Sequence, residues 1–361
     1  MSVTQIPLPF HYTARHLEPG DLRAALARDA RAGLTATPKW LPPKWFYDAT
    51  GSELFTRITR LPEYYQTRRE TAVLRENAAE IARLTAAETL VELGSGTSEK
   101  SVILLDALSA AGTLKTYSPV DVDAVTLDAA ARRVAEDHPA LAVWAVCADF
   151  ERHLALLPAF GRRLVVFLGG TIGNLDDDAR ASFLRELRAT LVPGDALLLG
   201  ADLVKDTGRL VAAYDDAAGV TAAFNRNVLA VLNRELGADF VPRAFQHVAL
   251  YDAGRHRVEM RLRARQRMRV RLRDLGLDIG FAAGEEMRTE ISVKFHRYRL
   301  EHELGRAGFT VTRWYTDPAQ DFAVVLAHVP GEGGGGGSYR VTGRRRDRGA
   351  PVGRTAGRRA G

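Results

Sequence analysis

The chain has 361 residues, of which 46% are hydrophobic, so it is long enough for one large domain or two ordinary ones. It has no run of eighteen apolar residues, no secretory leader pattern and a single cysteine, Cys147, which excludes an internal disulfide; we therefore expect a cytoplasmic protein without a membrane span. The net charge of +6 lies wholly in residues 331–361, which hold eight of the 50 basic residues and only two of the 44 acidic ones. The rest of the chain is neutral, which argues against a specific nucleic-acid partner.

Residues 1–85 carry helical patterns separated by loops. Thr67 and Glu70 have the T-x-x-E spacing of a capping box, which predicts that a helix starts there. The loop before this helix contains two adjacent tyrosines, Tyr64 and Tyr65. Core packing and ligand binding both remain open for this pair, and packing is the commoner role.

Residues 90–100, LVELGSGTSEK, predict a buried strand, a tight glycine turn and a helix with Thr97 or Ser98 as its N-cap. Glycine lets a ligand approach such a turn closely. A dinucleotide-binding turn has a third glycine where Glu99 stands, and a carboxylate there would repel a pyrophosphate. The E-x-G-x-G form instead resembles the first motif of class I methyltransferases. Their ligand, S-adenosylmethionine (SAM), has no phosphate, so no third glycine is needed. An ordinary strand-to-helix turn is the alternative.

Strands then alternate with helices, which implies a parallel sheet covered on both faces. The last two expected strands flank residues 317–320, a connection too short for a crossover, so they must form an antiparallel hairpin. The expected strands are 89–93, 115–120, 141–147, 163–169, 195–201, 309–316 and 321–329, and the expected helices are 98–111, 124–137, 178–191 and 294–307.

An insertion of about a hundred residues separates the fifth and sixth of these strands. It is expected to contain helices at 205–215 and 217–237 and strands at 243–251 and 256–273. Arginines alternate with apolar residues along the last strand. This arginine stripe is either a polyanion-binding ribbon or a solvated sheet face paired with neighbouring acids, and the neutral body favours the second interpretation.

Ligands of a doubly wound sheet bind beyond the carboxyl ends of its strands. Asp121 stands at the end of the second strand, where an acid can accept hydrogen bonds from ribose hydroxyls, whereas Asp123 is suited to cap the next helix. At the third strand end, Asp149 can accept from an adenine amine while Phe150 packs on the ring. With Glu92 at the first strand end, these acids favour a SAM site.

The fourth strand leads into residues 167–175, which contain three glycines and Asn174. The glycines leave space for a small ligand, and the Asn174 amide offers both donors and an acceptor. The nine histidines are scattered and show no metal-ligand spacing, so we expect no metal.

Four stretches occur together: residues 61–65 (LPEYY), 92–100 (ELGSGTSEK), 168–174 (LGGTIGN) and 289–295 (TEISVKF). In this combination the chain resembles the SAM-dependent histidine Nα-methyltransferases of ergothioneine biosynthesis, over about residues 10–329. The resemblance implies trimethylation of L-histidine to hercynine, the first step of that pathway, with SAM leaving as S-adenosylhomocysteine (SAH). It also implies a Rossmann-like class I methyltransferase fold, that is, a doubly wound, mainly parallel α/β sheet with a C-terminal antiparallel hairpin, and a smaller α+β substrate domain.

The resemblance also implies a set of site residues. Tyr47 and Asn174 would be catalytic, with Tyr47 facing the reacting amine and acting as a base through a water. Asn174 and Tyr214 would hold the substrate carboxylate, and Met260 would either line the same pocket or pack in the core. The implied cofactor contacts are Tyr47, Gly94, Lys100, Asp121, Asp149 and Phe150, and the implied histidine contacts are Tyr64, Asn174, Tyr214, Glu290 and Ser292.

We expect a monomer built from five segments. These are a helical segment at 1–85 that contributes to the substrate pocket, a SAM-binding domain at 86–202, a substrate-binding insertion at 203–293, the end of the sheet at 294–330 and a disordered Gly/Arg-rich tail at 331–361. The alternative function is a class I methyltransferase that acts on another amino acid, a nucleic acid or a protein.

Overall fold

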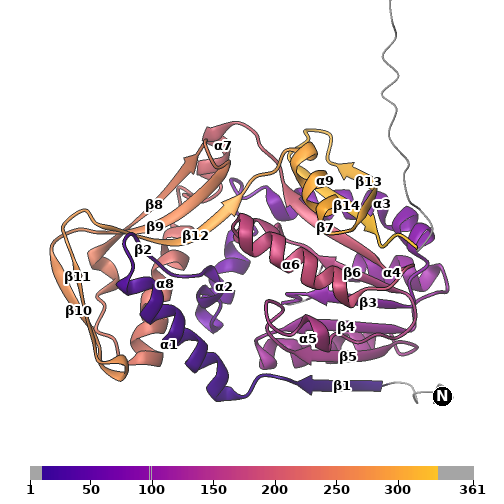
Figure 1. The fold of residues 1–361 in the computed structure, drawn as a ribbon, viewed down its shortest axis with the longest axis horizontal. Helices are drawn as coiled ribbons and strands as arrows, with labels where there is room; N and C mark the ends of the chain where they lie inside the picture. The colour runs from indigo at the N-terminus through magenta and orange to yellow at the C-terminus, as the bar shows by residue number, and fades with distance from the viewer. Residues whose placement is uncertain (1–9, 97, 99, 332–361) are drawn as a thin grey trace, which may run out of the picture.

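The computed structural model describes residues 10–96, 98 and 100–331, which form two lobes (Figure 1). The larger lobe contains an eight-stranded sheet, and the smaller lobe contains a four-stranded sheet and a two-stranded hairpin. Within the described residues, no helix is long and apolar enough to cross a bilayer. Thr97, Glu99 and the tail from 332 onward, all discussed above, lie outside the described residues.

The large sheet has the strand order β1-β5-β4-β3-β6-β7-β14-β13 and is parallel from β1 to β7. Strand β14 runs antiparallel to both β7 and β13, which confirms the expected C-terminal hairpin and the class I methyltransferase sheet. The strands are β1 (Phe10–Arg15), β3 (Thr89–Leu93), β4 (Thr116–Asp121), β5 (Ala142–Cys147), β6 (Arg163–Phe167), β7 (Ala196–Asp202), β13 (Thr310–Thr316) and β14 (Phe322–His328).

Strand β1 lies in a segment that was expected to be helical, so that prediction was wrong for residues 10–15. It pairs in parallel with β5 at the edge of the sheet. Its sequence, FHYTAR, alternates apolar and polar residues, the pattern of a half-buried strand, but only over six positions. The strand depends on a partner more than a hundred residues away, and local patterns carry no signal for such pairing.

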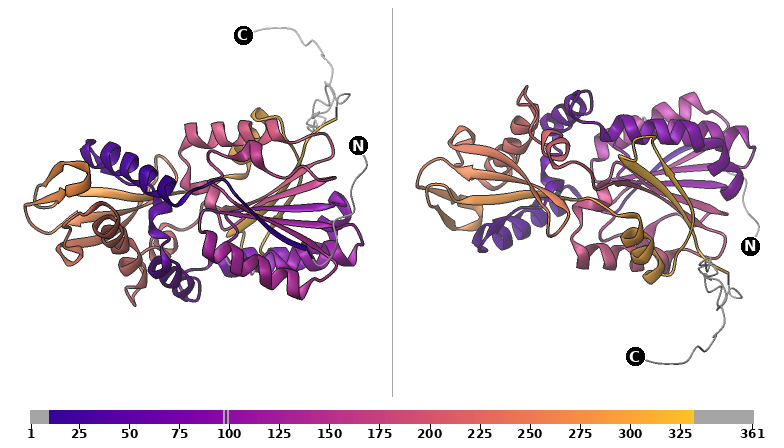
Figure 2. Two further views of the ribbon diagram at one scale, coloured as in Figure 1. Left: turned by 90° about the horizontal axis from the view of Figure 1, so that it is seen from below. Right: turned by 90° about the horizontal axis from the view of Figure 1, so that it is seen from above.

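Helices cover both faces of the large sheet (Figure 2). The helices α3 (Gln66–Thr85), α4 (Val102–Ala110) and α5 (Ala124–Asp137) pack on one face, and α6 (Asp177–Thr190) and α9 (Arg297–Arg306) pack on the other. Helix α4 begins later than expected, with Ser101 as its N-cap. Ser98 has a φ of +58°, a left-handed conformation outside a helix, so the Ser98 cap was a wrong prediction.

The small lobe combines the N-terminal helices with the insertion. Its sheet has the order β2-β12-β9-β8, and β10 pairs with β11 in a separate hairpin. The expected single strand at 256–273 was therefore wrong, because the chain leaves the first sheet at Ala264 and enters the second at Met268. The elements are α1 (Pro19–Thr35), β2 (Lys39–Trp40), α2 (Ala49–Ile58), α7 (Thr207–Ala212), α8 (Val220–Leu236), β8 (Phe245–Asp252), β9 (Arg257–Ala264), β10 (Met268–Leu272), β11 (Leu277–Phe281) and β12 (Glu286–Val293).

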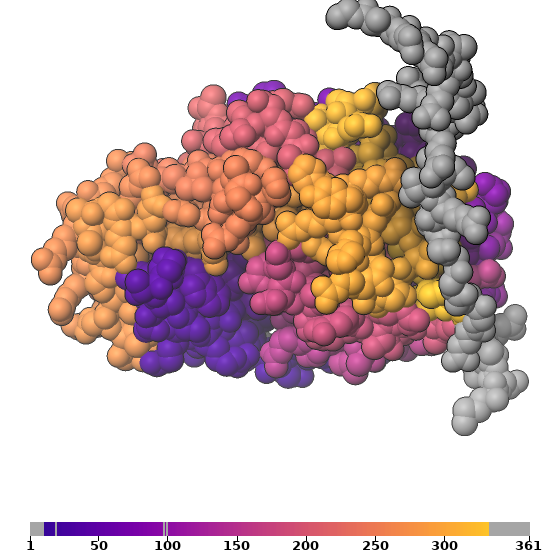
Figure 3. All heavy atoms as spheres, turned by 45° about the horizontal axis from the view of Figure 1, so that its top comes forward, coloured from indigo at the N-terminus to yellow at the C-terminus, as the bar shows by residue number. Residues whose placement is uncertain are grey.

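Helix α1 joins the insertion although almost two hundred residues separate them along the chain. Figure 3 shows α1 as an indigo patch beside the orange strands of the insertion. Arg23 donates to Asp274 at 2.6 Å, and Arg31 donates to the backbone carbonyl of Leu275 at 2.6 Å. Apolar residues of α1, such as Leu26 and Ala30, share one core with α8 and with β8 to β12.

The β9 part of the arginine stripe is partly paired with acids. Arg261 pairs with both Glu259 and Glu286, Arg263 pairs with Glu286, and Arg257 pairs with Glu259. These pairs support the interpretation of β9 as a sheet face paired with neighbouring acids, whereas among the described residues no ion pair is recorded for Arg265, Arg267, Arg269 or Arg273 farther along the stripe.

Candidate active site

The first part of the site is the turn between β3 and α4. Gly94 and Gly96 have φ values of +69° and +49°, which favour glycine, so the backbone folds tightly at the end of β3. Asp121, at the end of β4, accepts the Gly96 N–H at 2.9 Å. Asp123 caps α5 by accepting the Val125 N–H at 3.0 Å. Asp121 thus fixes the glycine turn and still has acceptor capacity for a ligand hydroxyl, whereas Asp123 is occupied by the helix.

Lys100 lies where the turns after β3 and β6 meet. It pairs with Glu70, a fully buried carboxylate of α3, which also accepts the Gly169 N–H at 2.8 Å. The capping-box prediction for Glu70 was wrong, because α3 begins at Gln66 with Tyr65 as its N-cap. Glu70 instead ties α3 to both ligand-facing turns.

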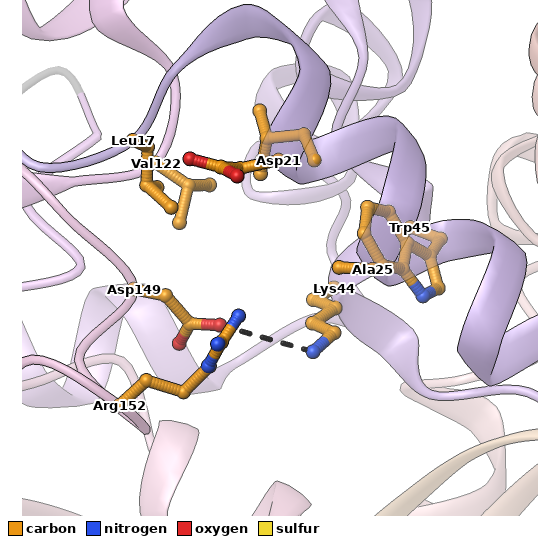
Figure 4. A pocket seen from close by; sticks show the side chains of 9 residues that line it. Leu17, Asp21, Ala25, Lys44, Trp45, Val122, Asp149 and Arg152 are labelled. Carbon is orange, nitrogen blue, oxygen red and sulfur yellow. Dashed lines mark ion pairs between the residues drawn. The ribbon is translucent and has the colours of Figure 1, made fainter.

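A recess lies between α1 and the ends of β4 and β5 (Figure 4). Asp149 stands at its rim, 3.9 Å from the Lys44 ammonium nitrogen. Phe150, next in the chain, packs edge-on against Phe167, with ring centroids 5.2 Å apart. The other lining residues are Leu17, Asp21, Leu22, Ala25, Trp45, Val122 and Arg152. Five of the nine lining residues are apolar and four are charged, and the placement of an adenine ring at Asp149 and Phe150 stays a prediction.

Asn174 and Glu290 meet directly across the two lobes. Asn174 follows β6 and donates to Glu290 Oε1 at 3.1 Å and to the carbonyl of Ile291 at 2.7 Å. A bulge in β12 between Arg288 and Glu290 turns the strand locally at this point. Burial raises the pKa of Glu290 to about 7, against the opposing effects of Lys294 and Asn174.

A second polar pair adjoins the first. Tyr214 donates its phenolic hydrogen to Ser292 Oγ at 2.8 Å, and both residues are buried. Ser292 lies two residues beyond Glu290, so the strand presents both on the same side. Tyr64 is buried as well, and burial followed by the neighbouring Tyr214, Tyr47 and Glu290 raises the pKa of its hydroxyl.

Tyr47 lies between Asp121, at the end of β4, and the side chains of Glu290 and Tyr214. It is 44% exposed, yet its hydroxyl is desolvated by surrounding protein, and this burial, followed by Glu290, Tyr214 and Asp121, raises its pKa well above the usual range. The hydroxyl therefore remains protonated at neutral pH. This argues against a phenolate base and leaves Tyr47 as a neutral hydrogen-bonding group.

Hydrogen bonds behind the pocket support β12. Thr289 donates to the Asn225 side chain at 2.6 Å, Asn225 contacts His247 at 2.8 Å, and His247 contacts the carbonyl of Tyr214 at 2.8 Å. Met260 lies directly opposite Glu290 on β9 and is 2% exposed within the core of the small lobe. The core therefore holds the pocket wall in place.

Sequence reasoning missed two charged residues of this region, Asp202 and Lys294, whose side chains lie 2.8 Å apart. Asp202 ends β7, so the strand-end rule that selected Asp121 applies to it equally. Lys294 lies between Val293 and Phe295, and a lysine in an apolar run indicates a buried ion pair. In the part of the chain that the structure describes, no cluster of three metal-binding side chains occurs.

Glu92 gives a pH-dependent prediction. It is buried under the glycine turn and accepts from Ser101 and Tyr117, and burial raises its pKa from 4.5 to about 7. Its contribution to stability is complete below pH 4.5 and is lost as the pH rises through about 7. The free energy of unfolding of the wild type relative to E92Q should fall by about 2 kcal/mol between pH 5 and pH 8, measured by urea denaturation. A difference that does not change with pH would contradict the assignment.

The comparisons with known proteins agree with this geometry. A family model described as histidine-specific methyltransferase, SAM-dependent, matches residues 26–329. The chain is 59% identical to a histidine N-alpha-methyltransferase of Mycolicibacterium smegmatis and 56% identical to one of Mycobacterium tuberculosis, in each case over 87% of this chain and 98% of the relative. It is 30% identical to ergothioneine biosynthesis protein 1 of Schizosaccharomyces pombe, over 62% of this chain and 31% of that protein.

Proposed function

The chain belongs to the family of SAM-dependent, histidine-specific methyltransferases, and from this premise we propose that it adds three methyl groups to the α-amine of L-histidine. The product would be hercynine, formed in the first step of ergothioneine biosynthesis. The relatives named for histidine methylation and for ergothioneine biosynthesis support this assignment. Because every residue of the candidate site comes from one chain, we propose that a monomer is active.

The meeting of Glu290, Asn174, Ser292 and Tyr214 beside Asp121 carries the proposal. Imidazole has one nitrogen that donates and one that accepts. Glu290 accepts the imidazole N–H, and Ser292 or Tyr64 satisfies the other nitrogen. Tyr214 and Asn174 hold the substrate carboxylate; because both N–H donors of Asn174 are engaged with Glu290 and the Ile291 carbonyl, one of them turns to the carboxylate when the substrate binds. We propose that residues 203–293, together with α1 and α2, form the unit that binds the amino acid.

Positioning is the main catalytic device in this account. Bound SAM supplies an electrophilic methyl group on its sulfonium. Asn174 and Tyr214 fix the carboxylate, which aims the lone pair of the α-nitrogen at that methyl group in line with the bond that breaks. Tyr47, between Asp121 and Glu290, accepts a hydrogen bond from the neutral amine and orients it. Each ammonium form loses one proton to solvent before its methyl transfer, since Tyr47 remains protonated, and the third transfer, onto the tertiary amine, gives a quaternary nitrogen with no proton left to release.

A time course tests this function. The purified protein is mixed with SAM and L-histidine, and the products are followed by mass spectrometry. We expect mono- and dimethylated species to appear and then convert to the trimethylated product, and Nα,Nα-dimethylhistidine to be accepted as a substrate. Accumulation of a monomethylated end product would overturn the assignment of hercynine as the product.

A macromolecular acceptor is the second candidate, suggested by the arginine stripe. The ion pairs of Arg257, Arg261 and Arg263 with two glutamates offset part of the positive charge that polyanion binding needs. We therefore favour the small-molecule acceptor. Strong, salt-sensitive binding of RNA or DNA by a variant that lacks residues 332–361 would reverse this preference.

A further inference from the structure

Lys294 is a fully buried lysine immediately after β12. Its ammonium nitrogen lies 2.8 Å from Asp202, 2.9 Å from the Tyr214 hydroxyl and 2.8 Å from Ser292 Oγ. An ammonium group has three donors and no acceptor, so these three contacts occupy it completely. Lys294 thus joins an acid of the large sheet to two hydroxyls of the amino-acid pocket.

Asp202 has a second cationic partner, Lys205. The Lys205 ammonium also donates to the Tyr65 hydroxyl at 2.7 Å and to the carbonyl of Leu203 at 2.6 Å. Two buried ammonium groups therefore share one carboxylate, and the carboxylates of Glu290 and Asp321 also lie within electrostatic reach of Lys294 and Lys205, respectively. Within the described residues, Lys205 has no recorded hydrogen bond to a pocket hydroxyl, so the two lysines differ in what they touch beyond Asp202.

The Lys294 ammonium also determines which way the pocket hydroxyls donate. Because it only donates, the oxygens of Tyr214 and Ser292 must accept from it. Tyr214 passes its own hydrogen to Ser292, which accepts twice and makes no recorded donation to another described residue. Of the two hydroxyl hydrogens, only that of Ser292 has no recorded acceptor among the described residues, so this hydrogen is available to a ligand. A hydroxyl donor backed by an ammonium group favours an anionic group.

From this arrangement we infer that Lys294 is a positioning residue that selects substrates with a free α-carboxylate, acting through the hydroxyls of Tyr214 and Ser292, which leaves Tyr64 to satisfy the second imidazole nitrogen. The inference rests on the proposed function and adds a determinant of substrate class to it. Amino acids with an ionised carboxylate are accepted, and the corresponding amino alcohols, amines and amides are discriminated against.

The test compares L-histidine with L-histidinol, which keeps the imidazole and the amine but replaces the carboxylate by a hydroxymethyl group. Dissociation constants are measured by calorimetry on the SAH-loaded wild type, K294M and K205M. Both variants remove a buried lysine from Asp202, but only K294M removes the contacts to Tyr214 and Ser292. Thermal stability and SAH affinity are recorded for each.

We expect the wild type to bind L-histidine at least about 100-fold more tightly than L-histidinol, and K294M to reduce this ratio to below about tenfold. In K205M the ratio should stay within about threefold of the wild type, even if stability falls. An unchanged ratio in K294M, or an equal reduction in both variants, would overturn the role of Lys294.

Two further outcomes are an unfolded K294M variant and an inactive wild type. If K294M fails to bind SAH and is therefore unfolded, Y214F serves in its place, because it keeps the ion pair and removes one of the two hydroxyls; an unchanged ratio in Y214F overturns the inference. If the wild type neither binds nor methylates L-histidine, the proposed function fails and the inference fails with it. A wild type that methylates L-histidine while K294M keeps the full ratio refutes the inference alone.

Discussion

Replacement of Glu290 by alanine is expected to weaken L-histidine binding by at least about 100-fold while SAM affinity stays within about threefold. Glu290 is a half-buried residue whose carboxylate is desolvated by surrounding protein and has a single recorded donor among the described residues, Asn174, so it is free to accept the imidazole N–H. Its loss leaves the substrate N–H without a partner in a desolvated pocket. Calorimetry with L-histidine on the SAH-loaded protein measures the loss, and a separate SAH titration measures cofactor binding.

Glu286 supplies the matched control for this experiment. It lies on the same strand, but its carboxylate pairs with Arg261 and Arg263 on the outer face of the sheet. E286A should therefore leave L-histidine affinity within about threefold of the wild type. Equal losses of L-histidine affinity in E286A and E290A, or a parallel loss of SAH affinity in E290A, would contradict the assignment of Glu290 as the imidazole acceptor.

Replacement of Asp121 by alanine is expected to have the second large effect, on SAM binding. We expect SAM affinity to fall by about 100-fold, because the variant loses both the ribose acceptor and the contact that holds the Gly96 N–H. The L-histidine affinity of the cofactor-free protein should change far less. Fluorescence or calorimetric titration with SAH gives the comparison directly.

Asp123, two residues away, provides the control for Asp121. Its carboxylate caps α5, so D123A is expected to lower stability by about 1 kcal/mol and to leave SAH affinity within about threefold. If D123A weakens SAH binding as much as D121A does, the loss reflects damage to the turn as a whole and not the removal of a ligand contact.

Much of the large sheet was predictable because its strands are short apolar runs bounded by turn residues. The seven strands expected for the large sheet lie within two residues of the observed ones. Buried parallel strands read as continuous hydrophobic segments. Strand β1 was missed although its six residues alternate apolar and polar side chains, because so short a pattern does not identify β5 as its partner.

Site residues were predictable where their role follows from their local position in the chain. Asp121 at a strand end and Asp123 at a helix start are separated by local chemistry alone. Glu70 was misassigned because a T-x-x-E spacing describes a cap equally well, and only the tertiary fold brings Lys100 and Gly169 to its carboxylate. No periodicity reveals such a contact between distant segments.

Lys294 and Asp202 illustrate the same limit. Each is conspicuous as a charge within an apolar neighbourhood, yet their partnership depends on β12 returning to the large sheet beside β7. Spacing along the chain does not encode this return. The signal available in the sequence was the unpaired charge itself, and it indicated that a partner existed without identifying it.

The most direct measurement of the central claim is a competition among acceptors. The purified protein is mixed with SAM and an equimolar mixture of the twenty amino acids, and all products are identified by mass spectrometry. We expect that L-histidine alone is methylated and that it gains three methyl groups on its α-nitrogen. Methylation of a different amino acid, or of histidine on its imidazole ring, would contradict the assignment of Glu290, Ser292 and Asn174 to the histidine pocket.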